Sequence, residues 1–234
     1  ARWEAGEQSA SRALTLGRLH LVHVRDDAGK ALFYLRQARE GGALSGPDGH
    51  LLFGRAYAKA EDYDNALAEY RAYLKTGARD GRVTAMYYLG WLPYDRQRYE
   101  EALPEFDRFL AAFPGEKKRS YILWFKGWSQ YQLGRWQDAL RTFEAMIPLG
   151  NNLVAGKAMY WGGKAHKALG NDVEARAWMG RAIDRYPLSY YAVLAAQRLS
   201  EWDGTPLPDW IVGPSPGLPG PAPLWPFDRI PKPL

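Results

Sequence analysis

Apolar residues along most of this chain recur at spacings of three and four, the period at which side chains share one face of an α-helix. Pairs of helical stretches are separated by short polar turns. The first helices of the pairs are predicted at 48–60, 83–95, 120–133 and 156–169. The turns fall at 61–62, 97–98, 134–135 and 170–171, and the second helices begin at Tyr63, Tyr99, Trp136 and Val173. The pattern therefore predicts an all-α chain of helical hairpins.

A register of small residues is superimposed on this helical pattern. Glycines recur at intervals of 36, 37 and 36 residues, an alanine follows each glycine after twelve residues, and a large apolar side chain follows each alanine after four. The glycines are Gly54, Gly90, Gly127 and Gly163; the alanines are Ala66, Ala102, Ala139 and Ala175; the large residues are Tyr70, Phe106, Phe143 and Met179. Small residues allow the two helices of a hairpin to cross closely. Stacked hairpins bury the apolar faces that one hairpin leaves open, so we expect a curved scaffold.

The segments outside the repeats follow other patterns. Residues 1–45 carry two helical stretches, around Ala10–Val24 and Ala28–Glu40, which we interpret as a leading pair that caps the array. The four repeats and a terminal helix at 187–202, with Pro187 near its first turn, make up residues 46–202.

From residue 203 to residue 234 the composition changes, because ten of the sixteen prolines lie there. This composition excludes a helix and predicts an extended, polyproline-like linker or docking tail. The apolar residues of the tail that could dock on the repeats are Trp210, Ile211, Trp225 and Phe227.

The glycine, alanine and aromatic positions resemble those of the tetratricopeptide repeat over residues 46–185. The resemblance implies a right-handed superhelix of hairpins. One residue departs from the family pattern. Pro93 stands in the first helix of the second repeat, and a proline there removes a backbone donor. We expect that helix to bend or to end early near 92–94.

A narrower resemblance involves the end of the repeats. The segment from Tyr186 to Leu199, read Tyr-Pro-Leu-Ser-Tyr-Tyr and then Leu-Ala-Ala-Gln-Arg-Leu, is similar to the last helical element of soluble lytic murein transglycosylases. Further similar segments are 32–39, 160–165, Gly90-Trp91 and Gly127-Trp128. The resemblance implies a periplasmic protein associated with peptidoglycan. Catalysis in that family needs a Glu-Ser pair followed by a Gly-Leu-Met-Gln segment, and neither stands in this chain, so we predict no enzymatic activity for it.

Aromatic residues gather at the first-helix positions that line the inner face of such a superhelix. They are Tyr87, Trp91, Tyr94, Tyr121, Trp124, Trp128, Tyr131 and Tyr160. Flat aromatic faces suit sugar rings and apolar peptide side chains, so the residues are candidates for a ligand surface. The alternative, which we favour on the pattern alone, is that they pack between successive hairpins.

Basic residues occupy other positions of this inner face. They are Arg55, Lys59, Lys157, Lys164 and Lys167. They could hold carboxylates of a peptide partner. The alternative interpretation is an ordinary solvated face.

Composition narrows the remaining functions. The net charge of +5 is spread along the chain without a basic run, which argues against a nucleic-acid partner, and no apolar run is long enough to span a membrane. The chain has no cysteine, and the pair His20 and His23 lacks a third ligand, so we expect neither a metal nor a cofactor. The first residues do not form a signal peptide.

Three functions remain open at this point. The first is a non-catalytic scaffold of the cell envelope that positions peptidoglycan or a partner protein. The second is an adaptor between proteins with no glycan role. The third is the amino-terminal part of an active lytic transglycosylase whose catalytic domain lies beyond Leu234.

Overall fold

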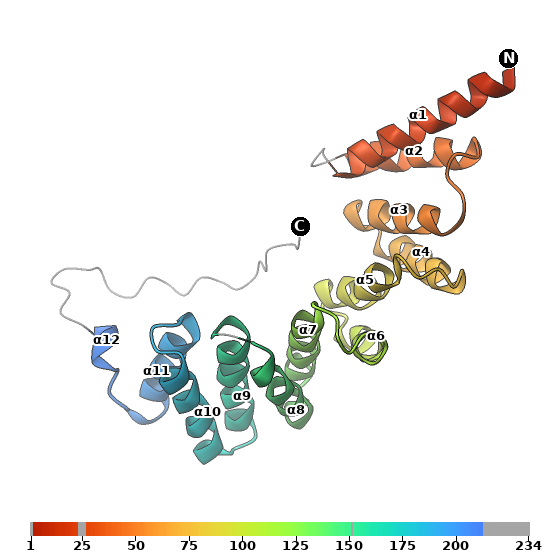
Figure 1. The fold of residues 1–234 in the computed structure, drawn as a ribbon. Coiled ribbons are helices and arrows are strands. Elements are labelled where there is room, and N and C mark those ends of the chain that lie inside the picture. The colour runs from red at the N-terminus through yellow and green to blue at the C-terminus, as the bar shows by residue number, and fades with distance from the viewer. Residues whose placement is uncertain (1, 23–26, 151, 213–234) are drawn as a thin grey trace.

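The chain folds into a row of antiparallel helical hairpins (Figure 1). The computed structural model describes residues 2–22, 27–150 and 152–212, and all regular structure in these residues is helical. The hairpins are α1 (Arg2–Val22) with α2 (Ala28–Glu40), α3 (Gly46–Lys59) with α4 (Tyr63–Lys75), α5 (Arg82–Asp95) with α6 (Tyr99–Ala112), α7 (Arg119–Gln132) with α8 (Trp136–Met146), and α9 (Lys157–Ala168) with α10 (Asp172–Arg185). The predicted all-α class is confirmed.

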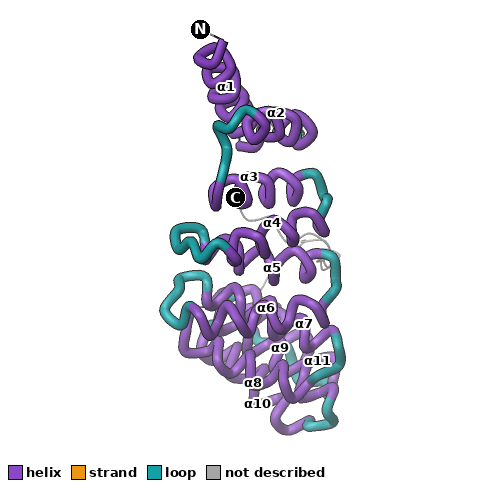
Figure 2. The backbone as a smooth tube through the Cα atoms, turned by 90° about the vertical axis from the view of Figure 1, so that its right-hand side faces the viewer, coloured by secondary structure: helices purple, strands orange, loops and turns teal. Residues whose placement is uncertain are grey.

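Shorter elements complete the array. A 3₁₀ turn at Ile147–Leu149 and a π-helical turn at Asn152–Gly156 connect α8 to α9. After α10 come α11 (Tyr190–Asp203) and the single turn α12 (Asp209–Val212). The first helices of the repeats lie along the inner side of an arc and the second helices along its outer side (Figures 1 and 2). The inner side of the arc is therefore formed by α3, α5, α7 and α9, followed by α11.

The two helices of each repeat cross where the sequence places glycine. A Cβ atom built on Gly90 would lie 2.6 Å from the ring of Phe106, and one built on Gly54 would lie 2.8 Å from the ring of Tyr70. The corresponding distances are 2.6 Å from Gly127 to Phe143 and 3.0 Å from Gly163 to Met179. All four large side chains and all four repeat alanines are buried. The role assigned to the glycine–alanine register is confirmed.

The turn between the two helices of a repeat has the same geometry in each copy. One residue takes a left-handed conformation, and the N–H of the next residue donates to a carbonyl five residues back, which satisfies the helix end. The left-handed residues are Glu61, Gln97, Gly134 and Gly170, with φ of 60°, 59°, 71° and 78°. The hydrogen bonds are Asp62 to Tyr57, Arg98 to Pro93, Arg135 to Gln130 and Asn171 to His166, each 2.9 Å.

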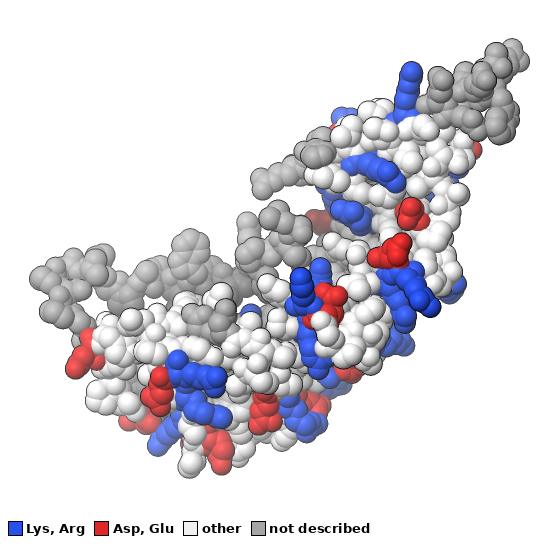
Figure 3. All heavy atoms as spheres, viewed as in Figure 1, with Lys and Arg blue, Asp and Glu red and all other residues white. Residues whose placement is uncertain are grey.

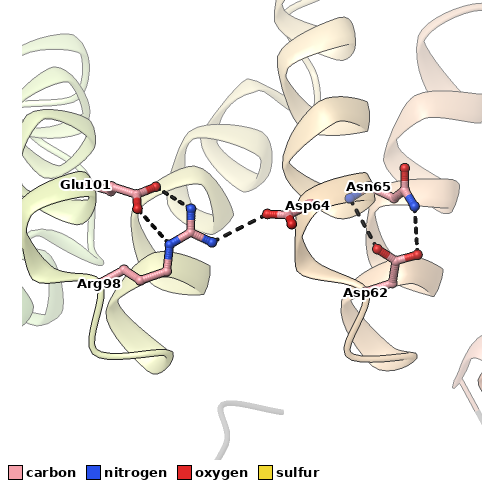
Figure 4. Close-up of polar contacts among 5 residues, drawn as sticks. All are labelled: Asp62, Asp64, Asn65, Arg98 and Glu101. Carbon is pink, nitrogen blue, oxygen red and sulfur yellow. Dashed lines mark hydrogen bonds and ion pairs between the residues drawn. The ribbon is translucent and has the colours of Figure 1, made fainter.

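Ion pairs join these turns from one repeat to the next. Arg98, the residue directly before α6, donates to Glu101 in the first turn of that helix and, through Nη1 at 3.4 Å, to Asp64 at the start of α4 (Figure 4). Asp62 caps the start of α4, because its carboxylate accepts hydrogen bonds from the backbone N–H and from the side chain of Asn65. In the next repeat Arg135 reaches Glu100 at 2.7 Å. Because these ion pairs are exposed, each contributes only modestly to the free energy of unfolding. They connect the ends of successive hairpins.

Four details differ from the sequence-based expectations. Helix α5 continues through Pro93 to Asp95, so it does not end early, and the bend stays a prediction. The second helix of the last repeat begins at Asp172 and not at Val173, and Val173 is 76% exposed, whereas the rings of Tyr63, Tyr99 and Trp136 at the equivalent positions are half-buried. The last long helix begins at Tyr190 and is capped by Ser189, so Pro187 lies outside it. Helix α1 extends well beyond the predicted start at Ala10.

The tail is also less extended than predicted. Residues Asp209–Val212 form the short helix α12, which contains Trp210 and Ile211. Trp210 is exposed. The two other apolar candidates, Trp225 and Phe227, lie outside the described residues, so their docking stays a prediction, as does the division of the chain at residues 45 and 202.

We predict that Gly90→Ala destabilises the protein although alanine favours helices. The new Cβ meets the buried ring of Phe106, and such overpacking costs about 1–3 kcal/mol, which outweighs the gain in helix propensity of about 1 kcal/mol. The matched control is Gly180→Ala in α10, where a Cβ meets nothing within 4 Å and propensity should raise stability. Urea denaturation measures both variants. Equal effects of the two substitutions would contradict the steric role of Gly90.

We also predict that Gln97→Gly stabilises the protein by about 0.5–1 kcal/mol, because a side chain in the left-handed conformation is strained. Gln97 is exposed and its backbone already has the geometry of the glycine turns. The reverse change, Gly134→Gln, should destabilise by a similar amount. Chemical denaturation of the two variants tests the pair, and a loss of stability in Gln97→Gly would contradict the prediction.

Candidate binding surface

Helix α7 presents an aromatic stripe to the inner side of the arc. Trp124, Trp128 and Tyr131 follow one another at spacings of four and three, so they share one face of the helix. All three are half-buried. Trp128 stacks between its neighbours, with its ring centroid 5.6 Å from that of Trp124 and 5.9 Å from that of Tyr131. The stripe is therefore partly packed and partly open to solvent.

Trp161 of α9 completes the cluster, and the sequence did not single it out as a site residue. Its ring lies edge-on to Trp128 at 4.6 Å and to Tyr131 at 5.2 Å, and 6.3 Å from Trp124. The first helix of the last repeat thus packs its tryptophan against the preceding repeat. The sequence did contain a signal for this residue, because a tryptophan stands directly before the Gly162–Gly163 pair. The repeat register, however, placed that tryptophan next to an inner-face position and not on one.

Lys157 lies at one side of this tryptophan cluster. It is the first residue of α9, directly after the π-helical turn, and its Nζ stands 4.1 Å from the centre of the Trp124 ring. Burial lowers the pKa of Lys157 to about 8. Within the described part of the chain the side chain of Lys157 has no hydrogen bond or ion pair. The ammonium group is thus held by an aromatic face and lacks a carboxylate partner.

Lys164 lies at the other side of the cluster. Its Nζ is 4.6 Å from the centre of the Trp161 ring, and burial together with the nearby Arg198 lowers its pKa. The Arg198 guanidinium pairs with Glu201 and lies by the hydroxyl of Tyr160. Among the described residues, no carboxylate forms an ion pair with Lys164. The site therefore holds three cations and one carboxylate.

The other predicted aromatic residues divide between core and surface. Tyr87, Tyr94 and Tyr160 are buried, and burial raises the pKa of Tyr87 and of Tyr94. Tyr94 packs 4.7 Å from Phe125 of the next repeat. These three residues thus pack between hairpins, as the alternative interpretation predicted.

Trp91 and Tyr121 lie nearer the surface. Trp91 is half-buried and stacks on the Tyr87 ring at 6.5 Å, whereas Tyr121 at the start of α7 is 62% exposed. Neither residue joins the cluster around Trp128 and Trp161 through a ring contact. A binding role for them stays a prediction.

The remaining basic candidates are separated from the tryptophan cluster or engaged elsewhere. Lys59 donates to the carbonyls of His20 and Leu21, each at 3.1 Å, and so ties α3 to the end of α1. Lys167 pairs with Asp172 at 2.8 Å. Arg55 is exposed on α3. The structure thus gathers Lys157 and Lys164, but not the other three, around the aromatic cluster.

The charges elsewhere on the visible surface do not form a large patch of one sign. Basic and acidic side chains intermix along the arc in Figure 3. No helix in the described part of the chain combines the length and the apolar character needed to cross a membrane.

A protein-family model described as the tetratricopeptide repeat matches residues 51–117 and 125–190, more than half of the chain. The chain belongs to the tetratricopeptide repeat family. The two matched stretches include most of the helices from α3 to α10. Trp128 and Trp161 lie inside the second stretch, and Trp124 lies directly before it.

Solved tetratricopeptide-like structures share this fold. MamA from strain AMB-1 is 22% identical with a TM-score of 0.60, and the match covers 79% of this chain and 96% of that one. YrrB, described as a TPR protein with an unusual peptide-binding site, is 21% identical with a TM-score of 0.60, over 83% of this chain and 95% of that one. MamA from Desulfovibrio magneticus RS-1 is 18% identical with a TM-score of 0.59, and the match covers 77% of this chain and 98% of that one. At these identities the likeness shows the fold alone.

No curated protein matches this tetratricopeptide repeat chain. The narrower likeness to the helical region of lytic transglycosylases finds no support among these matches and stays a prediction.

We predict that Lys157 gives this repeat protein a distinct dependence of stability on pH. Between about pH 8 and the ordinary lysine value of 10.5, the unfolded chain keeps a proton that the folded chain has lost. The free energy of unfolding should therefore rise with pH in this window relative to the Lys157→Met variant, and the difference should be constant below it. Urea denaturation of both proteins from pH 7 to pH 10 measures it. Parallel pH profiles would contradict the buried, unpaired ammonium.

Proposed function

We propose that this protein is a binding scaffold that holds an extended segment of a partner protein against the inner faces of α7, α9 and α11. The observation that carries the proposal is the tryptophan cluster of Trp124, Trp128 and Trp161 with the ammonium groups of Lys157 and Lys164 beside it. The rings are only half-buried, and the two ammonium groups lack ion-pair partners among the described residues. Aromatic surface with a few polar groups is typical of peptide recognition.

The family supports this function. Tetratricopeptide arrays expose a concave surface built from repeated first helices, and such surfaces bind other chains. YrrB, a structure with the same fold, is described as having a peptide-binding site. The binding residues of the present chain are proposed from its own side chains, because the shared identity is too low to transfer a site.

A glycan strand of peptidoglycan is the second candidate ligand. The solvent-open parts of the half-buried rings of Trp124, Trp128 and Tyr131 could also cover a sugar ring. The resemblance of residues 186–199 to the transglycosylase helical region favours this ligand and with it a periplasmic location. Co-sedimentation with purified peptidoglycan sacculi tests the idea. A protein that stays in the supernatant at every concentration tried would rule out the glycan role and leave the protein adaptor.

We predict that Trp128→Ala weakens the binding of peptides by about tenfold, or about 1.4 kcal/mol, without unfolding the protein. The probe is a set of peptides selected with the whole chain from a random phage-displayed library, and fluorescence anisotropy measures the affinity. The matched control is Phe33→Ala, which removes an exposed ring of α2 away from the cluster. If both variants bind as tightly as the original chain, the cluster is not the binding surface.

A further inference from the structure

We propose that the surface around Trp128 recognises an acidic, proline-rich segment in which two carboxylate side chains are three residues apart. The proposal rests on the function proposed above and names the chemistry of the partner. The segment would lie along α9, with one carboxylate at Lys157, the other at Lys164, and the two residues between them over the tryptophan rings.

Charge balance is the first argument. The cations of the site are Lys157, Lys164 and Arg198, and Glu201 is paired with Arg198. Helix α7 contributes only rings to the cluster. Glu201 also acts on Lys164 at longer range, but its carboxylate is engaged by Arg198. Among the residues that the structure describes, neither lysine has an ion-pair partner, and both are partly removed from water. A partner that supplies two carboxylates neutralises them, and charge-assisted hydrogen bonds in a partly buried site are strong.

Spacing is the second argument. Lys157 and Lys164 are seven residues apart on α9, so their backbone positions are about 10 Å apart along the helix axis. A polyproline II segment brings residues three apart onto the same side at a separation of about 9 Å. A β-strand offers same-side spacings of about 7 Å or about 13 Å, which fit less well.

The material between the two cations is the third argument. Trp124 lies under Lys157 and Trp161 lies under Lys164, at 4.1 Å and 4.6 Å, and Trp128 contacts both rings. Tryptophan rings that contact Trp128 therefore lie beside both ammonium groups. Proline-rich segments dock in grooves lined by aromatic rings and lose little conformational entropy, since they are already extended.

Capped proline host peptides that carry two glutamates test the proposal. The glutamates are separated by one, two or three prolines, and a fourth peptide carries glutamines at the middle spacing. Isothermal titration calorimetry with the whole chain measures each affinity. We expect the peptide with two intervening prolines to bind about fivefold more tightly than the other two, and the glutamine peptide to bind about thirtyfold more weakly. Equal affinity for all three spacings would overturn the spacing rule.

Protein variants identify the residues involved. Lys157→Met and Lys164→Met should each reduce the affinity for the peptide with two intervening prolines, toward the affinity that the original chain has for the glutamine peptide. The matched control is Lys75→Met, which removes an exposed lysine from the end of α4. If the control lowers affinity as much as the site variants, the attraction is only net charge and the proposal is wrong.

The two proposals fail in different ways. If glutamine and glutamate peptides bind equally and Trp128→Ala weakens both, the scaffold function stands and the acidic specificity is wrong. If the selected library peptides bind independently of Trp128, the scaffold surface itself is wrong, and the acidic specificity falls with it.

Discussion

Each repeat depends on a helix crossing at which a glycine faces a large buried side chain of the opposite helix. At the second repeat the ring of Phe106 fills the place that a Cβ on Gly90 would take. The crossing brings the two backbones close together, and the buried ring determines how far they are separated. Because the same contact recurs in four hairpins, the first helices all face the same side. The inner surface of the arc is a consequence of this repeated contact.

Packing between hairpins then decides which inner-face residues remain available. In the second repeat Tyr87 and Tyr94 are covered by Phe125 of the third repeat. At the equivalent positions of the third repeat Trp124 and Tyr131 stay half-buried, although Trp161 of the fourth repeat contacts both. Equivalent positions thus belong to the core in one repeat and to the surface in the next. The difference gives the array one candidate binding region instead of a uniform groove.

The helices and turns were predictable from the sequence because they depend on local periodicity and on backbone conformation. The turn containing Gln97 was located correctly even though its left-handed residue is not glycine. Helix α5 ends at Asp95, as its predicted range of 83–95 has it, although Pro93 lies inside it. A proline two residues before the helix end removes one hydrogen bond, while its own carbonyl still accepts from the Arg98 N–H.

The sequence by itself determined the repeat register, the all-α class and the aromatic stripe of α7 that forms part of the site, because these follow from residue spacing within single helices. The tertiary structure decided which other residues meet this stripe. Trp161 joins the cluster, and Lys157 rests on the Trp124 ring of another helix. Lys59 instead donates hydrogen bonds to the backbone carbonyls at the end of α1. These contacts join residues of different hairpins, and the angle between stacked hairpins depends on the summed packing of many side chains, which the period of one helix does not encode.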